Sequence, residues 1–414
     1  MKDYRKTKRA CYLGFVTQAI VANFTPLLFL AFHREYQIPI ASLALIPAVF
    51  YVVQLVTDFL CAKFKNLDYR KSIIASEVAS ALGLAGLAFL PQLFPHPMVG
   101  ILLCVTVYAV GSGLIEVLCS PIIEACPFPN KEGMMSLLHS FYCWGAVGVI
   151  LGSTLFFALF GLENWRILAC LWALIPLYNI VNFATCPIEP IVEDSEGLSM
   201  GQLLRNRSFW VFLVLMIAAG ASESSMAQWT SAFAEASLGV DKAVGDLAGP
   251  CGFAFAMGLG RLWYGKKGQH LDLSAYMTAA GVLCFASYLA ASLSPWPSVA
   301  LIGCMVSGLA VGIMWPGSIS LTSARMPGAG TALFALLALA GDVGGTLGPS
   351  LVGLCTRQAS SALQGGLESG LESGLESGLE SGLQGGPLIQ SGLLAASVFP
   401  LLLVASLLLI RRRK

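Results

Sequence analysis

Long apolar runs dominate this sequence, and each run is about as long as a lipid bilayer is thick. A helix needs about 20 mostly apolar residues to cross the hydrocarbon core of a membrane. Such runs lie near residues 10–32, 40–62, 73–91, 98–122, 135–159, 165–185, 208–233, 244–264, 273–293, 298–321, 329–355 and 388–410. We therefore predict an all-α membrane protein with twelve transmembrane helices.

The scarcity of charged residues supports this prediction. Of the 414 residues, 56% are hydrophobic and only 11% are charged. A soluble domain has about 25% charged residues. So little polar surface cannot cover a water-soluble globule of this size, whereas a bilayer solvates an apolar exterior. The net charge of +1 provides no basic face for nucleic acid, so we expect no nucleic-acid partner.

The positions of the basic residues predict how the helices are oriented. Cytoplasmic loops carry an excess of Lys and Arg. With the N-terminus inside, 20 of the 24 basic residues fall on the cytoplasmic side, and Arg34, Arg166, Lys242 and Arg357 fall outside. An odd number of spans would scramble this sorting. We therefore expect a multi-pass protein of the inner (plasma) membrane with both termini in the cytoplasm, surrounded by lipid and working as a monomer.

Two polar segments indicate the domain organisation. Residues 187–207 form an acidic, irregular stretch on the predicted cytoplasmic side, and they separate six spans from six. We interpret this stretch as a linker between an N-terminal six-helix bundle at 1–186 and a C-terminal six-helix bundle at 208–414. On the outside, a predicted loop at 357–387 repeats Gly-Leu-Glu-Ser four times, at residues 366–381. A four-residue unit is too short for a packed solenoid layer, so we interpret the loop as a low-complexity expansion. An extracellular binding segment is the alternative.

The residues that metal sites and enzymes need are not grouped in this sequence. The 12 cysteines are scattered singly through apolar runs, without a CxxC pair, and the four histidines lie far apart. Cysteine in such a setting is a small apolar packing residue. Residues 260–267 approach a phosphate-binding loop, but they lack its final Ser or Thr and follow a membrane span rather than a strand. We expect no enzyme, no cofactor and no metal.

Three acidic residues fall inside predicted spans. Glu116 lies in the fourth span, Glu223 in the seventh and Asp342 in the eleventh. Carboxyl groups within a membrane are costly and usually mark a pathway for ions or substrate. Because the sequence places no Lys or Arg deep in a span, we expect these carboxyls to lack a basic partner. Such a group can bind and release a proton as water access changes, which a proton-coupled carrier needs. The alternative is a carboxyl that stays protonated and only packs.

Other polar and aromatic residues in the spans are candidates for contact with a solute. Aromatic faces beside hydrogen-bonding groups suit sugars, which have apolar faces and hydroxyl edges. We therefore select as candidate substrate-binding residues Asn23, Gln18, Ser120, His139, Trp144 and Trp229. Ser120 lies one helical turn beyond Glu116, on the same face. For each tryptophan, packing or contact with lipid is the alternative.

A group of charged residues lies near the predicted cytoplasmic ends of the spans. Asp58 and Glu77 are in the second and third spans, and Arg70 and Lys71 are in the loop between them. Arg261 lies near the inner end of the eighth span. Asp58, Arg70, Lys71 and Arg261 are candidates for ion pairs that gate the protein. Ion pairs that only hold helices together are the alternative.

One region of the sequence resembles a known family. The run Gly111-Ser-Gly-Leu-Ile-Glu116, followed by Ser120-Pro121, resembles the fourth helix of the fucose permease group of the major facilitator superfamily. The run from Leu138-His139 to Gly145 is similar to the start of the fifth helix of that group. The first helix differs, since Asn23-Phe24-Thr25-Pro26 lacks the acid of the group's Asn-Asp pair.

The resemblance implies the major facilitator fold, with two six-helix bundles around a central cavity. It also implies a proton symporter for a sugar or a similar polar solute, with Glu116 as the functional carboxylate and no cofactor other than the coupling ion. The fifth helix lacks the Gly-Pro motif that is usual in antiporters of the superfamily, which favours symport. A proton-coupled exporter of drugs or metabolites is the alternative function.

Overall fold

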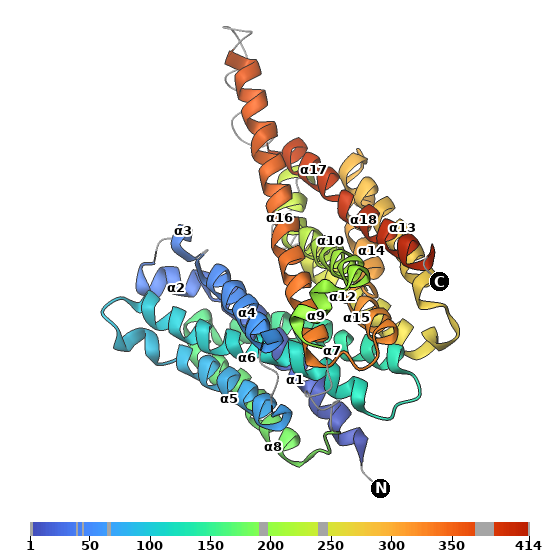
Figure 1. Cartoon of the computed structure of the whole chain (residues 1–414). Coiled ribbons are helices and arrows are strands. Elements are labelled where there is room, and N and C mark those ends of the chain that lie inside the picture. Colours follow the sequence, from blue (N-terminus) through green and yellow to red (C-terminus); the bar gives the residue numbers. More distant parts are fainter. Residues whose placement is uncertain are drawn as a thin grey trace. The chain divides into compact units, whose positions relative to one another are not determined.

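Helices form the regular structure of the described part of the chain. The computed structural model describes residues 3–38, 40–43, 45–63, 68–189, 198–238, 247–368 and 385–412 (Figure 1). Each of the twelve predicted spans coincides with one or two helices of the structure. The all-α fold class predicted from the sequence is therefore confirmed.

The first six spans have the following bounds in the structure. They are formed by α1 (Tyr4–Leu27) with α2 (Phe29–Tyr36), α3 (Ile40–Leu43) with α4 (Leu45–Lys63), α5 (Tyr69–Leu87), α6 (Pro97–Ala125), α7 (Lys131–Phe160) and α8 (Trp165–Thr185). Two short 3-10 helices, η1 (Leu90–Leu93) and η2 (Leu162–Asn164), precede α6 and α8.

The last six spans follow a short helix, α9 (Met200–Arg205), whose N-terminus is capped by Ser199. They are formed by α10 (Arg207–Leu238), the π-helix η3 (Leu247–Cys251) with α12 (Gly252–Lys267), α13 (Leu273–Leu293), α14 (Pro297–Val311) with α15 (Met314–Arg325), α16 (Thr331–Glu368), and α17 (Gly385–Ala396) with α18 (Val398–Arg412). The 3-10 helix η4 (Gly268–His270) joins α12 to α13.

Ten helical stretches in the described ranges are long and apolar enough to cross a membrane on their own. The two predicted spans that do not reach this standard are α5 and α12. The first carries Arg70, Lys71 and Glu77 within 19 residues, and the second has only 16 residues. The charged residues of α5 and the short length of α12 therefore explain why ten spans, and not the expected twelve, meet this standard.

By internal contacts the chain divides into two units. The first unit comprises Met1–Asn206 together with Ser323–Leu339, and the second comprises Arg207–Thr322 together with Ala340–Lys414. Of the predicted linker at 187–207, residues 190–197 lie outside the described residues. The exact domain boundaries predicted from the sequence stay a prediction.

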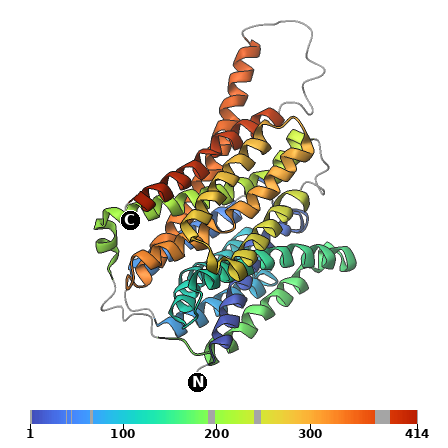
Figure 2. The ribbon, with the colours of Figure 1, turned by 90° about the vertical axis from the view of Figure 1, so that its right-hand side faces the viewer.

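The same neighbours recur within each unit. In the first unit, α5 packs against α6 and α8, α4 packs against α6, and α1 packs against α6, α7 and α8. In the second unit, α13 packs against α14 and α18, α12 packs against α14, and α10 packs against α14, α16 and α18. Figure 2 shows the long helices side by side within each unit. Because corresponding spans meet in both units, the units are structural repeats of one another.

Glycines allow the closest helix contacts in the second unit. A Cβ atom on Gly344 of α16 would lie 2.1 Å from the carbonyl oxygen of Ile217 on α10, and one on Gly220 would lie 2.1 Å from the carbonyl oxygen of Gly341. Such backbone contact is how small residues hold membrane helices together. Gly148, by contrast, would place a Cβ with no atom within 4 Å.

Polar contacts tie the end of α2 to the start of α8. Trp165 Nε1 donates to Glu35 Oε2 over 2.9 Å, and Arg166 forms an ion pair with the same carboxylate. Arg166 also donates to the Tyr36 hydroxyl over 3.1 Å and lies over the Trp165 ring, 4.9 Å from its centroid. These contacts fix one end of the first unit.

The predicted loop at 357–387 is shorter in the structure than in the sequence-based prediction. Helix α16 continues to Glu368, and α17 begins at Gly385, so both ends of the predicted loop are helical. The reason is that leucine, alanine and glutamine in residues 357–365 extend a helix readily. Most of the Gly-Leu-Glu-Ser repeat, residues 369–381, lies outside the described residues.

Candidate functional site

A buried carboxyl group lies at the centre of the first unit. Glu116 of α6 is only 9% exposed, and its Oε2 atom accepts two hydrogen bonds. One comes from Gln18 Nε2 of α1 over 2.8 Å, and the other comes from Gln54 Nε2 of α4 over 2.7 Å. Three helices therefore meet at this one carboxyl oxygen.

The local sequence brings α4 close enough to make this contact. Gly113 of α6 packs on α4, where an added Cβ would lie 3.0 Å from the Cβ of Thr57. Gln54 precedes Thr57 by about one turn, so it faces the same helix. Ser112 donates to Gln54 Oε1 over 3.0 Å, which directs the amide nitrogen of Gln54 toward Glu116.

The two amides that donate to Glu116, those of Gln18 and Gln54, are neutral groups. Amide groups donate hydrogen bonds without cancelling the charge of the carboxylate. The carboxyl can therefore lose a proton and remain hydrogen-bonded, or bind one and remain buried. Because an amide N–H can only donate, Oε2 stays an acceptor in both states, and a bound proton belongs on Oε1.

Two buried polar atoms beside Glu116 have no hydrogen-bond partner in the described part of the chain. They are Oε1 of Gln18 and Oγ of Ser120, which is 1% exposed. Buried polar atoms are normally paired with protein, water or ligand. The hydroxyl and the amide oxygen together offer a donor and an acceptor that suit a small polar solute.

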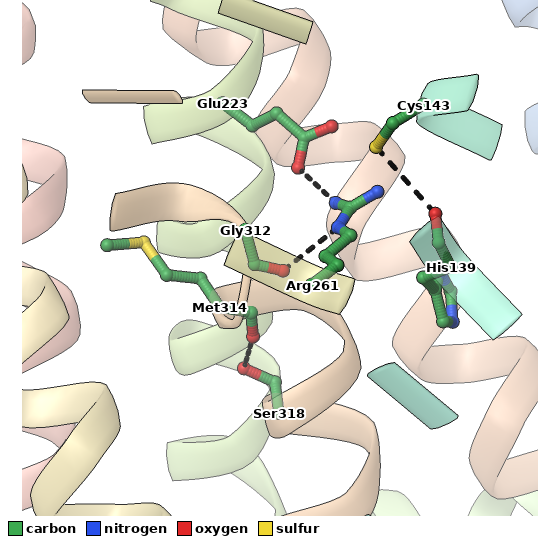
Figure 3. Close-up of polar contacts among 7 residues, drawn as sticks. All are labelled: His139, Cys143, Glu223, Arg261, Gly312, Met314 and Ser318. Carbon is green, nitrogen blue, oxygen red and sulfur yellow. Dashed lines mark hydrogen bonds and ion pairs between the residues drawn. The ribbon is translucent and has the colours of Figure 1, made fainter. Parts of the chain in front are cut away.

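The remaining candidates of the first unit lie on α1 and α7. His139 is 4% exposed, and its ring meets Phe15 edge-on with the centroids 4.7 Å apart. Figure 3 shows His139 with Cys143, which donates through Sγ to the His139 carbonyl over 3.8 Å. Asn23 donates to Ala19 O of its own helix over 2.8 Å, and Trp144 is half-buried. Of the candidates on α1, Gln18 is the one that donates directly to Glu116, whereas Asn23 donates to its own helix.

The second unit contains an ion pair that the sequence analysis did not predict. Arg261 of α12 lies 3.0 Å from Glu223 of α10, and Arg261 is 2% exposed (Figure 3). The prediction that the membrane acids have no basic partner is therefore wrong for Glu223. Because α12 continues to Lys267, Arg261 lies about two turns inside its helix and not at its end.

A proline explains why Arg261 turns inward. Its Nε donates to the carbonyl oxygen of Gly312 over 2.9 Å (Figure 3). That carbonyl would accept from the residue four positions on in a regular helix, but residue 316 is proline and has no N–H. The backbone is irregular at Gly312, between α14 and α15. Arg261 thus satisfies a carbonyl that Pro316 leaves without its helical donor.

The other candidates of the second unit lie on α10 and α16. Trp229 donates through Nε1 to Pro349 O over 3.1 Å, and a Cβ on Gly353 would lie 3.3 Å from its ring. The indole therefore also joins α10 to α16. Asp342 of α16 is half-buried, next to Gly341, on which the ring of Trp315 packs.

The predicted cytoplasmic ion-pair residues have separate positions in the structure. Arg70 donates to the carbonyl oxygens of Phe183 and Cys186 over 2.6 and 2.8 Å, so it caps the end of α8. Lys71 lies 3.0 Å from Asp68, the N-cap residue of α5. Arg70 thus lies at the C-terminal end of α8, where a cation is favoured, and Lys71 pairs with an N-cap carboxylate; a gating role for either residue stays a prediction.

Asp58 is fully buried, and it lies on α4 one turn beyond Gln54. A Cβ on Gly113 would lie 3.2 Å from Asp58 Oδ1, so Asp58 faces α6 beside the Glu116 network. Sequence reasoning missed Gln54 and Ser112. The signal was available: Gln54, Thr57 and Asp58 form a polar stripe on one face of an otherwise apolar helix.

A cavity of about 500 Å³ lies in the first unit, at the end of α6. Its lining includes Pro121 and Glu124 of α6, and Ser323, Gly330 and Phe334 from the segment 323–334. Ser323 Oγ donates to Glu124 Oε1 over 3.4 Å. The cavity lining does not include Glu116, Gln18 or Gln54, so this hollow is separate from the Glu116 network.

Comparison with known proteins places this geometry in context. A family model described as Major Facilitator Superfamily matches residues 10–349. A crystal structure of FucP, a transporter of that superfamily, in the outward conformation is similar with a TM-score of 0.76, 15% identity, and 98% of each chain covered.

Two further solved structures share the fold. A variant of the E. coli fucose:proton symporter FucP has a TM-score of 0.72 and 15% identity, with 95% of this chain and 97% of that chain covered. The proton:xylose symporter XylE bound to 6-bromo-6-deoxy-D-glucose has a TM-score of 0.72 and 12% identity, with 98% and 95% covered. No curated protein sequence gives a significant match to the chain.

Proposed function

Because the chain belongs to the major facilitator superfamily, we propose that it is a secondary active transporter that moves a sugar or a similar small polar solute by proton symport. The structural similarity to two sugar:proton symporters supports the choice of solute class. The proposal includes an inner-membrane location, both termini in the cytoplasm, and action as a monomer in lipid with no cofactor besides the coupling proton.

One observation carries the proposal of proton coupling. Glu116 is buried in the membrane region and is held by two neutral amides, Gln18 and Gln54. Both amides can donate to this carboxyl whether or not it carries a proton, and acids within a membrane usually mark a pathway for ions or substrate. Gln18 Oε1 and Ser120 Oγ supply the polar groups that a solute hydroxyl would contact.

The proposed coupling follows from the strength of the two hydrogen bonds. A bond to a charged group contributes about 1.5–3 kcal/mol, against about 0.5–1.5 kcal/mol for a neutral pair. Protonation of Glu116 therefore weakens the link of α6 to α1 and α4. A proton biases alternating access only if its affinity differs between the outward- and inward-open states, and this change in bonding provides such a difference.

The test is uptake of a panel of labelled sugars into proteoliposomes, with and without an inwardly directed proton gradient. We expect at least one sugar to accumulate only when the gradient is present. Glu163→Gln, a change at an exposed acid outside the long helices, is the matched control and should transport normally. Uptake of every sugar at the rate of empty liposomes would refute the proposed solute class. Gradient-driven efflux of apolar cations would favour the drug exporter.

A second candidate solute is an anionic metabolite. The observation that favours it is the buried guanidinium of Arg261, which binds the Glu223 carboxylate. If Glu223 binds a proton, a solute carboxylate can take its place on Arg261 and leave the local charge unchanged. Adding sugar acids to the panel distinguishes the candidates. Per amount of folded Arg261→Gln protein, uptake of the anionic solute should be lost, whereas uptake of neutral sugars should be kept.

A further inference from the structure

Another buried carboxyl lies in the first unit, away from the Glu116 contacts. Glu77 of α5 is fully buried. Its Oε2 contacts the Thr17 hydroxyl of α1 at 2.9 Å, and its Oε1 accepts from Asn179 Nδ2 of α8 over 2.7 Å. From the sequence, Glu77 is expected in a charged cluster near the cytoplasmic ends of the spans. The structure instead surrounds it with neutral groups from three helices.

The orientation of the Asn179 amide is fixed by its other contacts. Asn179 Nδ2 also donates to the carbonyl oxygen of Ala10 over 3.0 Å, and Asn179 Oδ1 accepts from Asn182 Nδ2 over 3.1 Å. The amide nitrogen must therefore face Glu77. Since an N–H cannot accept, Oε1 of Glu77 is an acceptor whatever the protonation state of the carboxyl.

The Thr17 contact leaves room for a proton on the other oxygen. A hydroxyl can donate to a carboxylate or accept from a carboxylic acid after a simple rotation. The 2.9 Å contact between Thr17 Oγ1 and Glu77 Oε2 therefore suits both states. The geometry assigns the proton of a neutral Glu77 to Oε2.

The titratable group that interacts with Glu77 from α1 is Cys11, which in turn contacts Cys119 of α6. From α8, the amide of Asn179 meets Glu77. Among the described residues, no Lys, Arg or His forms an ion pair with Glu77. A fully buried carboxylate without a cation is strongly disfavoured, so the protonated form suits this site.

One helix links the two buried carboxyls. Thr17, which contacts Glu77, and Gln18, which contacts Glu116, are consecutive residues of α1. Successive side chains of a helix point about 100° apart, so α1 presents one neighbour to each carboxyl. Space around α1 is limited, because a Cβ on Gly14 would lie 3.2 Å from Cys119 Sγ and 3.5 Å from Glu77 Oε1.

We propose that Glu77 is a second proton-binding site, formed with Thr17 and Asn179, and that α1 couples its occupancy to the state of Glu116. The site itself does not depend on the proposed transport function; only the coupling to Glu116 rests on it. A turn of α1 that lengthens the Gln18 contact also moves Thr17 away from Glu77. Protonation at one carboxyl thereby changes the hydrogen bonding at the other.

The test is infrared difference spectroscopy of the full chain in lipid nanodiscs, following the carbonyl band of protonated carboxylic acids across a pH titration. We expect Glu77→Gln to lose one such band that the wild type has at neutral pH. Thr17→Val, which keeps the shape and removes the hydroxyl, should shift that band. Glu163→Gln should leave the Glu77 band and its pH dependence unchanged.

The outcomes separate the parts of the proposal. If spectra of Glu77→Gln and the wild type superimpose at every pH, Glu77 holds no proton and the site is refuted. If Glu77→Gln does not fold, an unshifted band in Thr17→Val refutes the site instead. If Glu116→Gln leaves the titration midpoint of the Glu77 band unchanged, the coupling through α1 is refuted. None of these readouts requires transport, so failure of the proposed function is observed separately.

Discussion

The pair of Glu223 and Arg261 offers a quantitative test of how the second unit is held together. In Arg261→Met, the carboxylate of Glu223 loses a partner at 3.0 Å and the Gly312 carbonyl loses its donor at 2.9 Å. Removing one member of a buried ion pair costs about 3–5 kcal/mol, because the remaining charge is left in a low-dielectric site. An unsatisfied buried carbonyl adds about 1–3 kcal/mol.

Arg261→Met is therefore expected to destabilise the protein by about 4 kcal/mol or more. For a unit of roughly 200 residues, 1 kcal/mol corresponds to about 2–4 °C, so the melting temperature should fall by about 10 °C. Glu223→Gln combined with Arg261→Met removes both charges. This double variant should recover most of the loss, since no unpaired Glu223 carboxylate is left, although the Gly312 carbonyl still lacks the donor from Arg261.

Reaction with a thiol-reactive dye during heating in detergent measures this effect. Ten of the 12 free cysteines are buried, so unfolding exposes thiols that the folded protein protects. Arg261→Lys is the control, because it keeps the positive charge and loses the geometry of the guanidinium. Its melting temperature should lie between those of the wild type and Arg261→Met. The reasoning is refuted if the double variant melts at or below the temperature of Arg261→Met.

Three further predictions test individual contacts of the fold. Arg70→Ala removes the guanidinium that caps α8, so the melting temperature should fall by a few degrees, as about 1 kcal/mol of capping is lost. In Gly344→Val, the new Cβ would lie 2.1 Å from the carbonyl oxygen of Ile217, which is a clash, so gel filtration should show no folded protein. Gly148→Ala should be tolerated, because its Cβ would have no atom within 4 Å. At Asp68, the backbone N–H and side chain of Lys71 lower the pKa of the carboxyl. The stabilisation by this cap is therefore complete at a pH above the ordinary pKa of aspartate, and it is lost as the pH falls below the lowered pKa. Hydrogen exchange at the start of α5 should become faster in acid for the wild type. In Asp68→Asn, acid should not change the rate.

Apolar run length and residue spacing were sufficient to predict the helices and the burial of Glu116. Each predicted span is helical, because an apolar stretch of that length must satisfy its backbone within the membrane. These features depend on local sequence and on the solvent alone.

The partners of the polar side chains could not be predicted, because they depend on which helices become neighbours. Glu223 of α10 binds Arg261 of α12. Arg261 also binds the Gly312 carbonyl, which lacks a helical donor because residue 316 is proline. Glu77 contacts Thr17 and Asn179, which lie 60 and 102 positions away in sequence, whereas Arg70 and Lys71, which are close to it in sequence, bind other groups. No periodicity in one helix specifies such a partner in another.

Glu116→Gln tests the central claim most directly, since it keeps the shape of the side chain and removes its titratable group. In proteoliposomes, two rates are compared for a transported solute: accumulation driven by a proton gradient, and exchange of internal for external solute without a gradient. The account predicts that Glu116→Gln retains exchange and loses gradient-driven accumulation. Accumulation at the wild-type level in this variant would contradict it.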